Sequence, residues 1–128
     1  MKRTILVDTN IIIRLLLEDD IRLTNQAKLI FFKAQEGLCF IYLDEVVVAE
    51  VVWTLSSFYK LKKIDIINQL EKLIFQDWII NPRKKFILKS LFLYKIKNLS
   101  YIDCWIFIVN QSLRTSLETF DNDLKKLK

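Results

Sequence analysis

The sequence predicts an α/β fold in which helices cover both faces of a parallel sheet, and three observations lead to this prediction. Short apolar runs alternate with longer segments in which apolar residues recur at helical spacing. Glycine and proline occur once each, at Gly37 and Pro82, which favours helices joined by short loops. The chain has 128 residues, which fits a single domain over residues 1–128 with a proper core.

The first half of the chain is punctuated by residues that begin or end helices. Its strands are short apolar runs, ILV before Asp8 and LCFIYL after Gly37. Gly37 suits the C-terminal cap of a helix, and Asp44 suits an N-terminal cap. The expected elements are a strand at about residues 3–7, helices at about 9–17 and 21–35, a strand at 38–43, and a helix from Asp44 to about Tyr59.

The second half continues the alternation of helices and strands. Apolar residues recur at helical spacing between Ile66 and Ile74, and the run WII is ended by Asn81-Pro82. The expected elements are a helix at about 64–76, a strand at 78–80, helices at about 83–97 and 101–114, a strand at about 115–119, and a short helix from about 121.

Composition excludes several classes of protein. No apolar run reaches the roughly 18 residues that span a bilayer, and Asp8 interrupts what would be the core of a signal peptide, so we expect a cytoplasmic protein. Cys39 and Cys104 are expected to be buried free thiols. The net charge of +5 favours an anionic partner such as nucleic acid. The chain has no histidine, which excludes Ser-His and Cys-His catalysis.

Four acids stand in mainly apolar surroundings. Asp8 follows the first expected strand and Asp121 follows the last, so both belong at the sheet edge where ligands bind, and they converge if these strands are neighbours. Glu50 has Val46, Val47, Trp53 and Thr54 three and four positions away, which places it on a mostly buried helix face. Asp103 stands similarly within YIDCWIFIV.

Each acid also has a purely structural interpretation. Asp8 and Asp121 suit the N-terminal caps of helices, and Ser100 to Asp103 resembles a capping box with Asp in the usual place of Glu or Gln. Glu50 has no cap to serve in the middle of a helix, and Arg14 is the candidate partner for it.

Taken together, the acids favour a metal site. Several carboxylates at one sheet edge repel each other, and divalent cations relieve the repulsion. Oxygen ligands select Mg²⁺ or Mn²⁺. The chemistry that follows is metal-assisted displacement at phosphorus, which needs no histidine.

Four motifs in order resemble the PIN-domain ribonucleases, most closely the VapC-type toxins of toxin–antitoxin pairs. They are VDTN at the end of the first strand, AEVVWTL on a helix, SYIDCWI at the start of a later helix, and ETFDNDL near the end. The resemblance covers essentially the whole chain. It implies a three-layer α/β/α sandwich with a short, mainly parallel central sheet.

The resemblance also implies roles for single residues. By motif position, Asp8, Glu50, Asp103 and Asp121 take the places of the metal-binding catalytic acids. Asn10 takes the place of an asparagine that hydrogen-bonds behind the ligands, and Thr119 matches a residue that orients a water or a carboxylate. Asp123 is the reserve candidate for the fourth acid, and we expect it instead to be a solvated residue of the last helix.

The implied function is that of a Mg²⁺- or Mn²⁺-dependent endoribonuclease, the toxin of a type II toxin–antitoxin pair. Its implied partners are an RNA substrate, a cognate antitoxin protein and a second copy of the chain in a homodimer, with no membrane. Two other enzyme classes fail on chemistry. A haloacid-dehalogenase-like phosphatase needs an acid at Asn10, and a response-regulator receiver needs a pair of acids where only Asp8 stands. The alternative that stays open is a catalytically inactive PIN-like module that binds RNA or protein.

Overall fold

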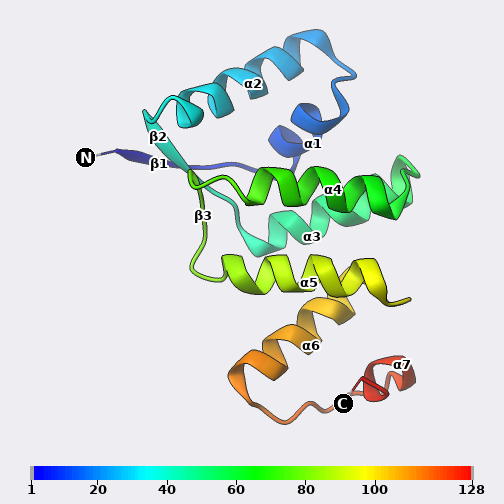
Figure 1. Cartoon of the computed structure of the whole chain (residues 1–128). Helices are drawn as coiled ribbons and strands as arrows, with labels where there is room; N and C mark the ends of the chain where they lie inside the picture. The colour runs from blue at the N-terminus through cyan, green and yellow to red at the C-terminus, as the bar shows by residue number, and fades with distance from the viewer. Residues whose placement is uncertain (1, 128) are drawn as a thin grey trace. The chain divides into compact units, whose positions relative to one another are not determined.

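The computed structural model describes residues 2–127. Within this range the chain forms three β-strands, seven α-helices and one π-helical segment, η1 (Figure 1). The described residues divide into two compact units that part between Pro82 and Arg83, and each unit is described by itself. The predicted domain spans residues 1–128, whose first and last residues lie outside the described part of the chain.

The first unit is built around a parallel sheet, as the sequence predicts. Its strands are β1 (Arg3–Leu6), β2 (Cys39–Tyr42) and β3 (Ile79–Ile80), in the order β1-β2-β3. Arg3 pairs with Cys39 in the first ladder, and Ile41 pairs with Ile79 in the second. Because all three strands run in the same direction, their carboxyl ends lie at one edge of the sheet.

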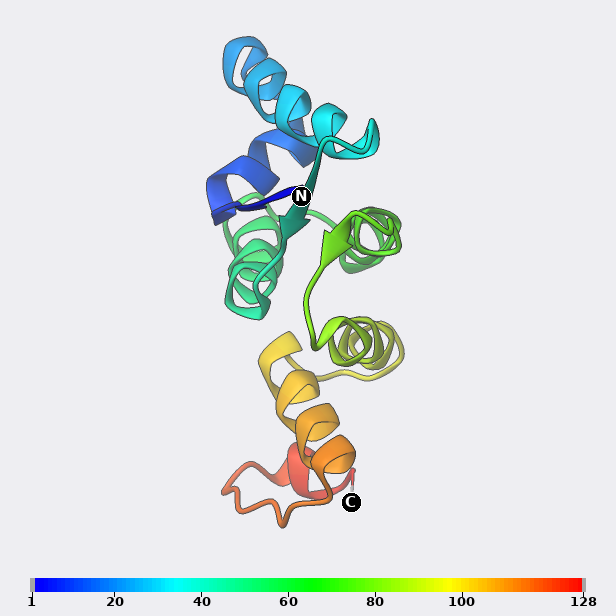
Figure 2. The ribbon, with the colours of Figure 1, turned by 90° about the vertical axis from the view of Figure 1, so that its left-hand side faces the viewer.

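Helices cover both faces of this sheet. The helical elements of the first unit are α1 (Thr9–Leu17), α2 (Ile21–Gln35), α3 (Glu45–Trp53), η1 (Thr54–Phe58) and α4 (Lys63–Ile74). Figure 2 shows α3 and α4 on opposite sides of the strands. Ile12, Ile41 and Leu70 are fully buried between the layers. The α/β class with a parallel sheet is thereby confirmed.

The predicted helix ends are confirmed at Gly37 and Asp44. Gly37 has a φ of 84°, and the amides of Gly37 and Leu38 donate to the carbonyls of Ala34 and Lys33 at 3.0 Å each. This pattern is a Schellman motif, in which the left-handed position favours glycine. The Asp44 carboxylate accepts from the amide of Val46 at 2.8 Å and so caps α3.

The second unit consists of α5 (Lys84–Ile96), α6 (Tyr101–Leu113) and α7 (Asn122–Lys125). Helices α5 and α6 pack through an edge-to-face contact of Tyr94 and Tyr101, with ring centroids 5.9 Å apart. Ile87, Leu91 and Ile108 lie buried in the second unit. No helix within residues 2–127 is long and apolar enough to cross a membrane.

The predicted strand at residues 115–119 is wrong, because this segment has no regular secondary structure. Helix α6 ends at Leu113, and its C-cap residue Arg114 has a left-handed φ of 55°. The amide of Thr115 then donates to the Asn110 carbonyl at 3.1 Å, and its hydroxyl donates to the Asn110 side chain at 2.7 Å. These bonds are local, and Leu117 alone supplies apolar surface in this segment, so a strand gains little there.

Candidate active site

Asp8 lies at the carboxyl end of β1 and begins α1. Its Oδ1 accepts a hydrogen bond from the amide of Ile11 at 3.2 Å, which confirms the capping interpretation. The side chain is exposed, so the apolar burial inferred from its flanking residues is wrong. Within residues 2–127 its other oxygen has no hydrogen-bond partner and remains free for a ligand.

Glu50 on α3 is joined to the same end of the sheet through Thr9. The Thr9 hydroxyl donates to Oε2 of Glu50 at 3.1 Å, which ties the first turn of α1 to α3. The buried face predicted for Glu50 is wrong, because Glu50 is exposed together with Val46 and Trp53, which are 62% and 65% exposed. Valines on the other side of α3, at positions 48, 51 and 52, supply the buried face instead.

Arg14 is not the partner of Glu50, contrary to the sequence prediction. Its guanidinium donates to both carboxylate oxygens of Asp19, at 2.8 and 2.9 Å. These hydrogen bonds are the main reason why the pKa of Arg14 is raised, with a smaller contribution from Tyr59. The carboxylate of Glu50 therefore has no ion-pair partner among the described residues.

A groove of about 490 Å³ runs along the carboxyl ends of β1 and β2. Asp8 and Asp44 both line it, together with apolar residues such as Val7, Ile11 and Val47. The sequence assigned Asp44 a capping role alone. Asp44 follows β2 as Asp8 follows β1, and this shared position was the signal that could have placed Asp44 beside the site.

In the second unit, Asp103 lies in the first turn of α6 and is half-buried. The Ser100 hydroxyl accepts from the Asp103 amide at 3.1 Å and caps the helix. A full capping box would also use the carboxylate of Asp103, but no described residue donates to it. The cap therefore gives Ser100 a structural role but gives none to the Asp103 carboxylate.

Asp121 begins α7 in the second unit. Its Oδ1 accepts from the Leu124 amide at 3.0 Å, and its own amide donates to the Thr119 hydroxyl at 3.0 Å. Thr119 thus orients the Asp121 backbone. The resemblance implied a different role for Thr119, namely the orientation of a water or a carboxylate. Asp123 is exposed in the first turn of α7, as expected. Asn10 is exposed in α1, and its side chain bonds to no residue between 2 and 127.

The four predicted acids share one electrostatic property. Each keeps at least one carboxylate oxygen without a hydrogen-bond partner, and none forms an ion pair with a described lysine or arginine. Oxygen donors of this kind fit a hard divalent cation. Two of them lie in each unit, and no group of three or more potential ligands is found within residues 2–127.

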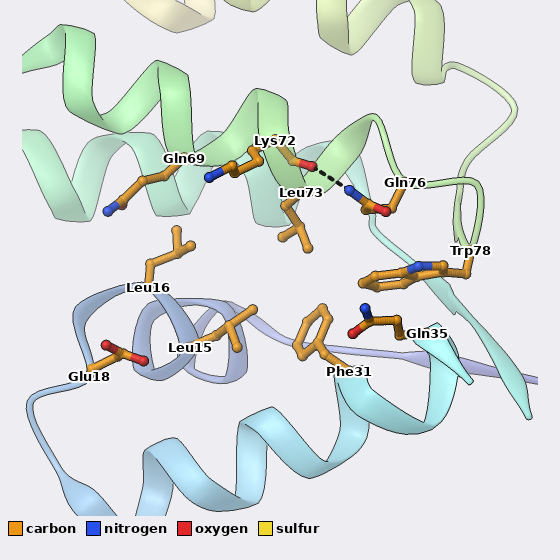
Figure 3. Close-up of a pocket in the computed structure, with 10 residues that line it drawn as sticks. All are labelled: Leu15, Leu16, Glu18, Phe31, Gln35, Gln69, Lys72, Leu73, Gln76 and Trp78. Carbon is orange, nitrogen blue, oxygen red and sulfur yellow. Dashed lines mark hydrogen bonds between the residues drawn. The ribbon is translucent and has the colours of Figure 1, made fainter. Parts of the chain in front are cut away.

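A second groove, of about 530 Å³, contains none of the predicted acids (Figure 3). Leucine side chains of α1 and α4 and the rings of Phe31 and Trp78 point into it, and Phe31 and Trp78 meet edge to face with centroids 6.0 Å apart. Glutamine side chains and Lys72 border these apolar residues. The groove therefore has an apolar floor and a polar rim.

A parallel α/β unit with free carboxylates at its strand ends defines a class of candidate metal-dependent enzymes. The family model of the PIN domain matches residues 5–128, and the chain belongs to this family. PIN domains are typically nucleases, and they generally use divalent metal ions. Comparison with curated proteins and with solved structures gives no match.

Proposed function

We propose that the chain is a Mg²⁺- or Mn²⁺-dependent endoribonuclease whose metal ligands are Asp8, Glu50, Asp103 and Asp121. One observation carries the proposal. In a chain of net charge +5, these four acids have no ion-pair partner among the described residues, and each presents a free oxygen. Membership of the PIN domain family supports the same reading.

The residues around the acids have defined tasks in this proposal. Thr9 holds one oxygen of Glu50, so the other oxygen points to a ligand in a fixed orientation. Ser100 anchors the helix turn that carries Asp103, and Thr119 anchors the backbone of Asp121. Bound divalent cations would supply charge neutralisation at phosphorus and an activated water. The carboxylates themselves bind and orient, and they make the site selective for hard cations.

We further propose that the enzyme is the toxin of a type II toxin–antitoxin pair that acts in the cytoplasm as a homodimer. The groove of Figure 3 supports the partner assignment, because its apolar floor and amide-rich rim suit a segment of another protein. Exposed Leu29 and Phe32 on α2 add apolar surface for a second contact. A search of the neighbouring DNA for a small open reading frame, followed by co-expression of its product with this chain and size-exclusion chromatography, tests this partner directly.

The alternative function is a PIN-like module that binds RNA or protein without cutting it. This alternative differs from the nuclease in one expectation, which is that the four acids serve only the fold and bind no metal. Asp8 and Asp121 do cap helices, but Glu50 caps nothing and the carboxylate of Asp103 is not used by its cap. Glu50 and Asp103 therefore favour the enzyme over the binding module.

Cleavage of RNA by the purified chain tests the proposal. With Mg²⁺ or Mn²⁺ we expect fragments from cellular RNA, and with EDTA we expect none. Asp103→Asn is the sharpest variant, because the backbone amide that binds Ser100 is retained while the charge is removed. We expect it to lose activity and keep the fold. An inert wild type in the presence of metal would favour the binding module.

A further inference from the structure

Trp53 presents an exposed indole one helical turn from Glu50. It follows Glu50 by three positions on α3, which places the two side chains on the same helix face. The side chain is 65% exposed, although tryptophan is usually mostly buried. Within residues 2–127 its ring has no aromatic, cationic or hydrogen-bonding partner. The exposed indole ring is therefore available to stack on a ligand.

The chain leaves the α-helical geometry directly after Trp53. Residues Thr54–Phe58 form the π-helical segment η1, which is closed by a bond from the Tyr59 amide to the Thr54 carbonyl at 3.1 Å. Short π-helical segments are rare and occur frequently at functional sites. This second feature marks the same end of α3.

The residues on this face of α3 indicate which kind of ligand can bind there. Glu50 lies between exposed Val46 and Trp53, so an apolar protein surface that covered all three would bury an unpaired carboxylate at a high cost. An unpaired nucleobase covers only the indole and leaves the carboxylate open to water and a cation. The net charge of +5 favours the polyanion that carries such a base.

We propose that Trp53 stacks on an unpaired base of single-stranded RNA and thereby positions the chain for cleavage beside Glu50. This inference rests on the proposed function, and it specifies the substrate as single-stranded at that position. In duplex RNA the bases already stack on one another, so the indole gains no partner there.

Fluorescence of Trp53 tests the inference without relying on cleavage. The variant Trp78→Phe/Trp105→Phe leaves Trp53 as the sole tryptophan, and adding Asp103→Asn prevents cleavage. We expect a ten-nucleotide single-stranded RNA, titrated in the presence of Mg²⁺, to quench the Trp53 emission. The same sequence in a duplex should quench it much less. Unchanged emission at saturating RNA, or equal quenching by the duplex, would overturn the inference.

Affinity measurements provide the second arm. Stacking of one base typically contributes about 10-fold to affinity, so Trp53→Ala should weaken binding by about that factor and Trp53→Phe should recover part of it. Phe75→Ala is the matched control, since Phe75 is 64% exposed at the end of α4 and should leave binding unchanged. Wild-type affinity in Trp53→Ala refutes stacking, whereas quenching by an RNA that the wild-type chain does not cleave in the presence of Mg²⁺ refutes the nuclease proposal instead.

Discussion

At the scale of single residues, Thr9 connects the end of β1 to the acid on α3. Its hydroxyl donates to Oε2 of Glu50 at 3.1 Å. Groups that hydrogen-bond to metal ligands typically contribute 10- to 100-fold to metal affinity or activity. We expect Thr9→Val to weaken Mn²⁺ binding about 10-fold in a calorimetric titration, and Thr9→Ser to bind as the wild type does. Equal affinities of the valine variant and the wild type would show that Glu50 needs no such support.

At this scale, sequence reasoning predicted the helix caps correctly and the burial of the acids wrongly, and the metal-binding role of the acids stays a prediction. Motif position named Asp8, Glu50, Asp103 and Asp121, and the caps at Asp8 and Asp121 follow from the preference of aspartate for helix starts. The burial of Glu50 was wrong because α3 is apolar on nearly every side. In such a helix the pattern does not say which apolar face enters the core, and here the face with Val48 does.

At the scale of elements, the start of α6 depends on the Ser100 cap. The Ser100 hydroxyl accepts from the Asp103 amide at 3.1 Å, and removing it leaves that amide without a partner. Replacing a serine cap by alanine typically costs about 1 kcal/mol of stability. We expect Ser100→Ala to lower the free energy of unfolding in urea by about that amount, and to lower Mn²⁺ affinity because Asp103 is less well held.

Ser116→Ala is the control for this prediction. Ser116 is exposed in the irregular segment after α6, so its replacement should change stability by less than about 0.5 kcal/mol. If Ser100→Ala behaves like this control, the cap does not hold the turn that carries Asp103.

Most elements follow from periodicity and from caps, and the two exceptions have physical reasons. Gly37, Asp44 and Ser100 mark helix ends through local hydrogen bonds, which a sequence reports well. The strand predicted at 115–119 needed a neighbour along its edge, and local bonds of Thr115 form instead. The π-helical segment η1 lies inside a stretch predicted as one helix, because α- and π-turns have no distinct sequence pattern.

At the scale of the whole molecule, a single domain over residues 1–128 remains our proposal. The structure divides into two compact units, and the family model spans both. If the two units are parts of one PIN domain, unfolding is cooperative. We expect one transition in urea, coincident by far-ultraviolet circular dichroism and by tryptophan fluorescence, since Trp53 and Trp78 lie in the first unit and Trp105 in the second. Two separate transitions would define two domains.

Titration with Mn²⁺ tests the central claim most directly, namely that the free carboxylates of Asp8 and Asp103 bind a divalent cation. The comparison uses the wild type, Asp8→Asn, Asp103→Asn and the double variant. Both residues are proposed metal ligands, so each single variant should lose at least about 10-fold in affinity, and the double variant should bind at least as weakly as the weaker single variant. Wild-type affinity in both single variants, or a wild type that binds no Mn²⁺, would contradict the account.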